Sequence, residues 1–186
     1  MSYSSGSRQA QLGDGFRSHV ISELNARGHS FVDTTALIDE ESGDYASYDS
    51  TLGDAIDEIW GLHLECKTSE DYPKSVTIKG YGRDNFIGDR RFYVTSFARR
   101  DPDGRLSYEN VKFFRSSDVR ARLLELKDDQ RWGVKKSKDG QYQPFNHESI
   151  LPYARGIDEF LERAMAEFPP REMDIDLSGL DVNEAL

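Results

Sequence analysis

The sequence predicts an α/β fold in which a mixed β-sheet is flanked by helices. Three observations indicate it: an amphipathic segment near each end of the 186-residue chain, short alternating segments between them, and a strong turn signal joining two of these. This length suits one domain with a hydrophobic core of its own. We therefore expect a single domain over residues 8–170 and an acidic tail, short of aromatic residues, over 171–186.

The first helix is expected over residues 13–28, with Gly28 as its C-terminal stop. Four apolar side chains recur there at helical spacing and would face the core: Phe16, Val20, Ile21 and Leu24. A strand is expected to follow over residues 29–37. Residues 39–51 are acidic and contain Ser and Gly, which predicts an irregular loop.

The most informative segment, residues 54–68, predicts a hairpin near Gly61 whose second strand carries Glu65 and Lys67. Side chains of a strand alternate between its two faces. One set would face the core: Leu62, Leu64 and Cys66. The other set would share the opposite face: His63, Glu65 and Lys67. A carboxylate and an ammonium group would then lie side by side, unless this is an exposed edge strand with an ordinary Glu/Lys pair.

Two upstream acids, Asp54 and Asp57, could add a second carboxylate to this face, which suits a hard cation such as Mg²⁺ that uses one or two carboxylates plus substrate phosphate oxygens. The register of the hairpin decides which acid does so. A turn centred on Gly61 places Asp57 opposite Glu65. A turn between Trp60 and Gly61 places Asp54 opposite Lys67 and sends Asp57 toward the core. Burying an unpaired carboxylate is costly, which favours Asp57, although a bulge could bring both acids to the metal.

The remaining elements follow from periodicity and turn residues. A short helix is expected between residues 75 and 86, and strands over 91–97 and 106–114 flank the turn at Asp101-Pro102-Asp103-Gly104. Ser116 or Ser117 can cap a helix with Val119, Leu123 and Leu126 on one face. A final helical stripe ends before Pro169-Pro170 and contains these residues: Ile157, Phe160, Leu161, Ala164, Met165 and Phe168.

The stretch from Asp57 to Thr68 resembles the PD-(D/E)XK, or restriction-endonuclease-like, nuclease superfamily, whose signature is an Asp followed by a (D/E)-x-K strand. The proline of that signature is missing here. The resemblance implies a restriction-endonuclease-like core and a metal held by Asp57 or Asp54, by Glu65 and by the backbone carbonyl of Cys66. It implies that Lys67 lies beside the attacking water. Helices at the position of residues 13–28 often present an acid toward the metal, where this chain has Arg17.

Charge is unevenly distributed along this chain of net charge −10. Residues 30–71 hold twelve acids and one base, whereas residues 82–122 hold ten bases and six acids. A phosphate-binding surface would be built from the arginines that follow the proposed site, although a solvated charged face has the same composition. Those arginines are Arg83, Arg90, Arg91, Arg99, Arg100 and Arg105.

The cysteine content and the hydropathy of the chain favour a cytoplasmic protein without a membrane partner. Cys66 is the only cysteine and so cannot form an internal disulfide. Its position on the leucine face of the strand favours a packed residue over a nucleophile. No apolar run approaches the length that spans a bilayer, and no signal peptide is evident.

The function expected from these features is a metal-dependent endonuclease that hydrolyses phosphodiester bonds, in duplex DNA above all. Mg²⁺ is the expected cofactor, with Mn²⁺ as a substitute, and a homodimer is implied by resemblance only. A different class also fits the acidity: a non-catalytic interaction protein, such as a DNA mimic acting on a nucleic-acid-binding partner. A mimic, however, has no evident use for Lys67 two residues after Glu65 on a strand.

Overall fold

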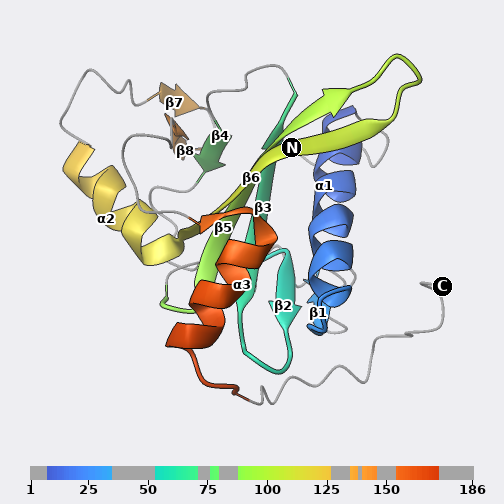
Figure 1. Cartoon of the computed structure of the whole chain (residues 1–186). Coiled ribbons are helices and arrows are strands. Elements are labelled where there is room, and N and C mark those ends of the chain that lie inside the picture. The colour runs from blue at the N-terminus through green and yellow to red at the C-terminus, as the bar shows by residue number, and fades with distance from the viewer. Residues whose placement is uncertain are drawn as a thin grey trace, which may run out of the picture.

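The computed structural model describes residues 8–34, 53–70, 76–79, 88–126, 135–137, 140–145 and 154–171. They form an α/β arrangement, with a mixed sheet flanked by helices, as predicted (Figure 1). The three helices are α1 (Arg8–Asn25), α2 (Ser116–Leu126) and α3 (Gly156–Glu167). None of these described helices is long and apolar enough to cross a membrane.

The larger of two sheets has six strands in the order β1-β2-β3-β5-β6-β9. Its strands are β1 (Phe31–Asp33), β2 (Ala55–Asp57), β3 (His63–Ser69), β5 (Arg91–Arg100), β6 (Leu106–Arg115) and β9 (Ala154–Arg155). Only β3 and β5 pair in parallel; the other neighbours are antiparallel. The smaller sheet consists of β4 (Val76–Lys79), β8 (Gly140–Phe145) and β7 (Lys135–Ser137), and lies with α2 on the left of Figure 1.

Helix α1 confirms the predicted apolar face but begins earlier than residue 13. Phe16, Val20 and Leu24 are fully buried, because their spacing places them on one side of the helix. The helix ends where expected, in a turn whose last residue, Gly28, has a φ of 87°. Glycine adopts this left-handed conformation without the steric penalty of a side chain.

The core lies between α1, α3 and one face of the large sheet. Leu62, Leu64 and Cys66 of β3 belong to the same buried cluster as the apolar stripes of α1 and α3, which confirms the predicted leucine face of this strand. The stripe of α3 is confirmed at five positions: Ile157, Phe160, Leu161, Ala164 and Phe168. Met165, predicted to share it, is instead 49% exposed because it lies on the outer side of the helix.

The hairpin of β5 and β6 confirms the turn predicted at residues 101–104. Gly104 closes this turn with a φ of 83°, and the side chain of Asp101 accepts a 2.7 Å hydrogen bond from the amide of Arg105. Helix α2 begins at Ser116, one of the two predicted starting residues, and Val119 is buried. Strand β5 of this hairpin also pairs in parallel with β3, and the two strands together carry the site.

One predicted element is wrong in type, and others lie outside the described residues. Residues 76–79 form strand β4 and not part of a helix, because they pair with β8. The β-branched residues Val76, Thr77 and Ile78 suit a strand. The predicted loop at 39–51, residues 80–87 and the tail beyond residue 171 are not among the described residues.

Candidate metal centre

The pairing of β2 with β3 differs from both registers considered for the sequence. Ala55 lies opposite Leu64 and Ile56 opposite His63, so that Asp54 comes beside Glu65. The amide of Asp54 donates a 2.6 Å hydrogen bond to the carbonyl of Leu64, the residue before Glu65, which holds Asp54 against this part of β3. The predicted pairs, Asp57 with Glu65 and Asp54 with Lys67, are both wrong. The reason is that the turn is not a tight one at Gly61 but spans residues 58–61, with the amide of Gly61 donating to the carbonyl of Asp57.

Three of the four predicted site side chains converge on one face of the sheet. Oδ2 of Asp54 accepts a 2.7 Å hydrogen bond from the backbone amide of Cys66, which tethers this carboxylate to the strand carrying the other two groups. Glu65 and Lys67 form an ion pair with each other, and their side chains are 22% and 29% exposed. Two carboxylates and an amine therefore lie together, partly withdrawn from water.

The proximity of these charges changes their protonation. Burial, followed by repulsion from the Glu65 carboxylate, raises the pKa of Asp54 to about 6. Burial alone would lower the pKa of Lys67, but the Glu65 and Asp54 carboxylates outweigh it and raise that pKa above its usual value. Without a further cation, the site thus holds two repelling carboxylates near neutral pH and a firmly protonated lysine.

The donor atoms present suit a small divalent cation. Within the described part of the chain, neither Oδ1 of Asp54 nor Oε2 of Glu65 receives a hydrogen bond. An oxygen pair of this kind matches the preference of Mg²⁺ for one or two carboxylates plus water and substrate oxygens. No cluster of three or more His, Cys, Asp or Glu side chains with metal-binding geometry occurs among the described residues.

Cys66 lies between Glu65 and Lys67 but turns its thiol to the opposite, buried face. Burial and the nearby Asp54 carboxylate raise the pKa of this thiol well above its usual value. A thiol that resists ionisation is a poor nucleophile and a poor metal ligand. Any contact of Cys66 with a metal would therefore come from its backbone carbonyl, as the resemblance implies.

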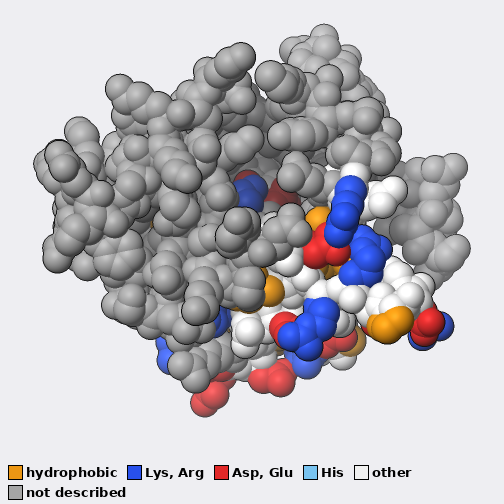
Figure 2. Space-filling model, turned by 90° about the horizontal axis from the view of Figure 1, so that it is seen from above, with side chains coloured by type: hydrophobic (Ala, Val, Ile, Leu, Met, Phe, Trp, Pro, Cys, Tyr) orange, Lys and Arg blue, Asp and Glu red, His pale blue; other side chains and the backbone are white. Residues whose placement is uncertain are grey.

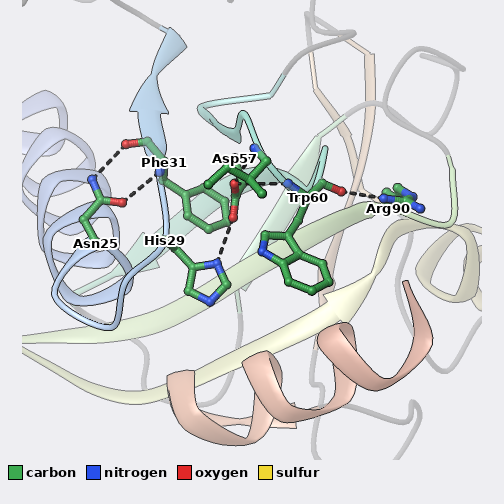
Figure 3. Close-up of polar contacts among 7 residues, drawn as sticks. Asn25, His29, Phe31, Asp57, Trp60 and Arg90 are labelled. Carbon is green, nitrogen blue, oxygen red and sulfur yellow. Dashed lines mark hydrogen bonds and ion pairs between the residues drawn. The ribbon is translucent and has the colours of Figure 1, made fainter. Parts of the chain in front are cut away.

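Asp57 belongs to a different polar cluster, shown in Figure 3. Its side chain is fully buried on the core face of the sheet. Oδ1 accepts hydrogen bonds from the amides of Ile59, at 2.9 Å, and Trp60, at 3.3 Å, while Oδ2 lies 2.9 Å from Nδ1 of the buried His29. These contacts satisfy the carboxylate and stabilise the turn between β2 and β3. The sequence analysis favoured Asp57 for the site face because burying an unpaired carboxylate is costly. That argument does not apply here, since the buried carboxylate of Asp57 is paired.

Strand β5 brings two further polar side chains to the site face. Tyr93 lies opposite Glu65 and Thr95 lies opposite Lys67 in the parallel pairing of β3 with β5. Burial, and then the charge of Glu65, raises the pKa of Tyr93 to about 12. The sequence alone does not predict this contact. The two strands lie about thirty residues apart in the chain, and no local pattern indicates that they pair in parallel or in which register.

The predicted arginine surface is only partly formed. Arg90 donates to the carbonyls of Trp60 and Pro169 and stacks on Phe168, so its role is structural. Arg91 is partly buried, and this burial lowers the pKa of its guanidinium, so it is less available to a partner than an exposed arginine. Arg100 bonds to Glu70 and to the carbonyl of Gly104. In Figure 2 basic and acidic side chains lie next to one another on the described part of the face shown.

The side chain of Arg99 is 72% exposed and forms a 3.2 Å ion pair with Glu109. Arg105 is also exposed, next to the hairpin turn. Arg83 lies outside the described residues. Of the predicted surface, the end of the β5–β6 hairpin is therefore the part best placed to meet a partner.

No protein-family model matches this sequence, and no curated protein is detectably similar to it. Function must be inferred from the geometry of the site itself.

Proposed function

We propose that the protein is a Mg²⁺-dependent endonuclease with a restriction-endonuclease-like core, in which Asp54, Glu65 and Lys67 carry the hydrolysis of phosphodiester bonds in duplex DNA. The observation that carries the proposal is the convergence of Asp54 and Glu65, two repelling carboxylates, beside the amine of Lys67. A site with these charges is costly to fold and gains most from binding a cation. Such strain is characteristic of functional sites.

The arrangement of elements supports the same proposal. The two acids come from adjacent antiparallel strands, β2 and β3, and β3 continues in parallel with β5. Helix α1 packs on the face of β3 that carries Leu62, Leu64 and Cys66, opposite to Glu65 and Lys67. Strand β3 joins the antiparallel and parallel parts of the sheet and carries Glu65. This arrangement is compatible with the resemblance of residues 57–68 to the nuclease superfamily if Asp54, in place of Asp57, is the first acid of the signature.

Each residue then has a definite role. Asp54 and Glu65 would hold the cation through their open oxygens. A bound Mg²⁺ supplies positive charge that stabilises the phosphate at the transition state and eases ionisation of the attacking water. Lys67 would orient that water through its ammonium group. Neutralising the two carboxylates removes the charge that raises the pKa of Lys67, so the same amine becomes better able to exchange a proton with the water.

The contact with DNA is proposed for the end of the β5–β6 hairpin. Arg99 lies on β5 four residues beyond Thr95, which is level with Lys67. At roughly 3.3 Å per residue, Arg99 is about 13 Å along the strand from the level of the site. A phosphate about four base pairs from the hydrolysed bond could meet it, since B-form base pairs repeat about every 3.4 Å.

Plasmid cleavage tests the proposal. Supercoiled DNA is incubated with the wild-type protein, Lys67→Ala and Arg163→Ala, each with Mg²⁺, Mn²⁺ or EDTA. Arg163 is an exposed residue of α3, so Arg163→Ala controls for the effect of a substitution outside the site, while Lys67→Ala, purified in the same way, controls for contaminating nucleases. We expect nicked or linear product from the wild type and Arg163→Ala with metal only, and none from Lys67→Ala. Absence of cleavage of plasmid, single-stranded DNA and RNA alike, or equal cleavage by Lys67→Ala, contradicts the proposal.

A further inference from the structure

Strand β6 has an open outer edge along the half that belongs to the hairpin. Its neighbour on that side, β9, pairs only with Lys112 and Phe113. The residue after β9, Gly156, has a φ of 73° and begins α3, so β9 does not continue along β6. Within the described part of the chain, no strand covers the outer side of β6 from Leu106 to Glu109. Figure 1 shows this part of the hairpin extending beyond α3 at the upper right.

The hydrogen bonds of the hairpin determine which backbone groups face outward. The amide of Asp101 donates a 3.0 Å hydrogen bond to the carbonyl of Arg105, so Arg105 directs its backbone groups toward β5. Hydrogen-bonded and non-hydrogen-bonded residue pairs alternate along an antiparallel pair of strands. The amides and carbonyls of Leu106 and Tyr108 therefore point away from β5. An edge with such outward groups is a template for pairing with another strand.

The regular part of this edge is bounded at both ends. Gly104, with a φ of 83°, closes the hairpin turn at one end. At the other end Asn110, with a φ of 55°, and Val111 lie together opposite Ser96, which forms a bulge in the pairing of β5 with β6. Residues 105–109 are therefore the regular edge available for pairing.

The side chains of this edge are complementary to those of a second copy. About a two-fold axis at Ser107, Arg105 of one copy lies opposite Glu109 of the other in an antiparallel pair, and Leu106 lies opposite Tyr108. Opposite charges, and an apolar side chain against an aromatic one, stabilise neighbouring strands. The axis itself passes an exposed serine, whose small side chain permits close approach. Each favourable pair occurs twice because of the symmetry.

The neighbouring registers match less well. An axis one residue later than Ser107 places Arg105 opposite the apolar Val111. An axis one residue earlier places Asp103 opposite Glu109, and these two carboxylates repel each other. The order of side chains along the edge therefore favours one register over its neighbours.

We infer that the protein forms a homodimer in which residues 105–109 of the two β6 strands pair edge to edge in antiparallel, centred on Ser107. The large sheets of both copies then form one continuous sheet. Glu109 can accept the guanidinium of Arg105 from the second copy, because its ion pair with Arg99 leaves the side chain 43% exposed. Few residues take part, so the dimer should dissociate on dilution. The inference goes beyond the proposed function and does not depend on it.

Sedimentation velocity of the full-length protein over a range of concentrations measures the dimer. We expect a monomer–dimer equilibrium for the wild type. Arg105→Glu and Glu109→Arg should each weaken the dimer about tenfold, since two attractive pairs become repulsive. The double variant exchanges the charges and should return to within about threefold of the wild type. Arg163→Ala, on the exposed side of α3, is the control and should leave the equilibrium unchanged.

Oxidative cross-linking tests the register. The thiols introduced by Ser107→Cys lie opposite each other at the axis and should form a disulfide-linked dimer, whereas Asp103→Cys, at the exposed turn, should cross-link about tenfold more slowly. The wild type, whose only cysteine, Cys66, is buried, is the control. A wild type that stays monomeric at every concentration overturns the inference and leaves the edge to a different protein. Equal dissociation constants for Arg105→Glu and the wild type, or equal cross-linking of the two cysteine variants, also overturn it.

Discussion

Asp54 and Asp57 lie three residues apart on the same hairpin, and both are withdrawn from water, yet they have opposite environments. Asp57 is fully buried on the core face and receives two amide hydrogen bonds and a histidine nitrogen. Asp54 is on the other face, receives one amide and stands against a second carboxylate. The pairing partners of a buried charge, and not its burial alone, thus distinguish a structural acid from a candidate catalytic one.

The largest expected effect is the loss of stability in Asp57→Ala. The substitution leaves two amides and His29 buried without an acceptor, so the free energy of unfolding should fall by about 3–5 kcal/mol. Chemical denaturation of the metal-free protein measures it. Asp54→Ala, the matched control, removes a repelled carboxylate and should cost far less. Equal losses in both variants would remove the distinction between the two acids.

The next effect concerns metal binding and cleavage. Asp54→Asn should weaken Mn²⁺ binding and slow DNA cleavage by at least about 100-fold, since a proposed ligand is lost. Asp57→Asn, tested at a temperature where it remains folded, should stay within about threefold of the wild type in both assays. Calorimetry and plasmid cleavage provide the numbers. The reverse ranking, with Asp57→Asn inactive and Asp54→Asn active, would show that Asp57 and not Asp54 is needed for metal binding and cleavage.

Asp54 should make the stability of the metal-free protein depend on pH. Its pKa is raised to about 6 in the folded protein from an unfolded value of 3.8, so its contribution to stability is complete below about pH 4 and is lost as the pH rises through 6. Relative to Asp54→Asn, the metal-free wild type should lose about 1–2 kcal/mol between pH 4 and pH 7, after allowance for partial solvent screening.

Denaturation curves of both proteins in EDTA at pH 4, 5.5 and 7 measure this difference. Saturating Mg²⁺ should remove most of it in the wild type, because a cation offsets the repelling charges. Parallel stabilities of the two proteins across that range would show that Asp54 carries no such strain.

The smallest expected effect is the coupling of Asp54 with Glu65. In a double-mutant cycle of Asp54→Asn and Glu65→Gln, without metal near pH 7.5, the double variant should be about 0.5–1 kcal/mol less stable than the sum of the single changes predicts. Either single change relieves the same repulsion, so it cannot be relieved twice. Asp57→Asn paired with Glu65→Gln is the control and should be additive, since these side chains lie on opposite faces.

Much of the fold follows from patterns in the sequence. Alternation assigned Leu64 to the core and Glu65 to the opposite face, and helical spacing assigned Phe16 and Phe160 to buried stripes, because burial on one face leaves a periodic trace. The turn at 101–104 was predictable from its residues. Strand β4 was not, since its pairing with β8 joins segments more than sixty residues apart, and such pairing leaves no local signal.

The site was predictable in composition but not in register. Glu65 and Lys67 could be identified by the E-x-K pattern on a strand, and both aspartates were candidates. The choice between them depended on a turn that spans residues 58–61, and that turn is stabilised by hydrogen bonds to Asp57 itself. The partner of Asp57, His29, comes from before β1, so no local pattern shows that its charge is compensated.

The most direct test of the site is a crystal structure of the wild-type protein soaked with Mn²⁺, with anomalous scattering used to locate the ion. We predict one peak within coordination distance of an Asp54 oxygen and a Glu65 oxygen, on the face that carries Lys67. A peak beside Asp57, or none at Asp54 and Glu65 in fully soaked crystals, would contradict the account.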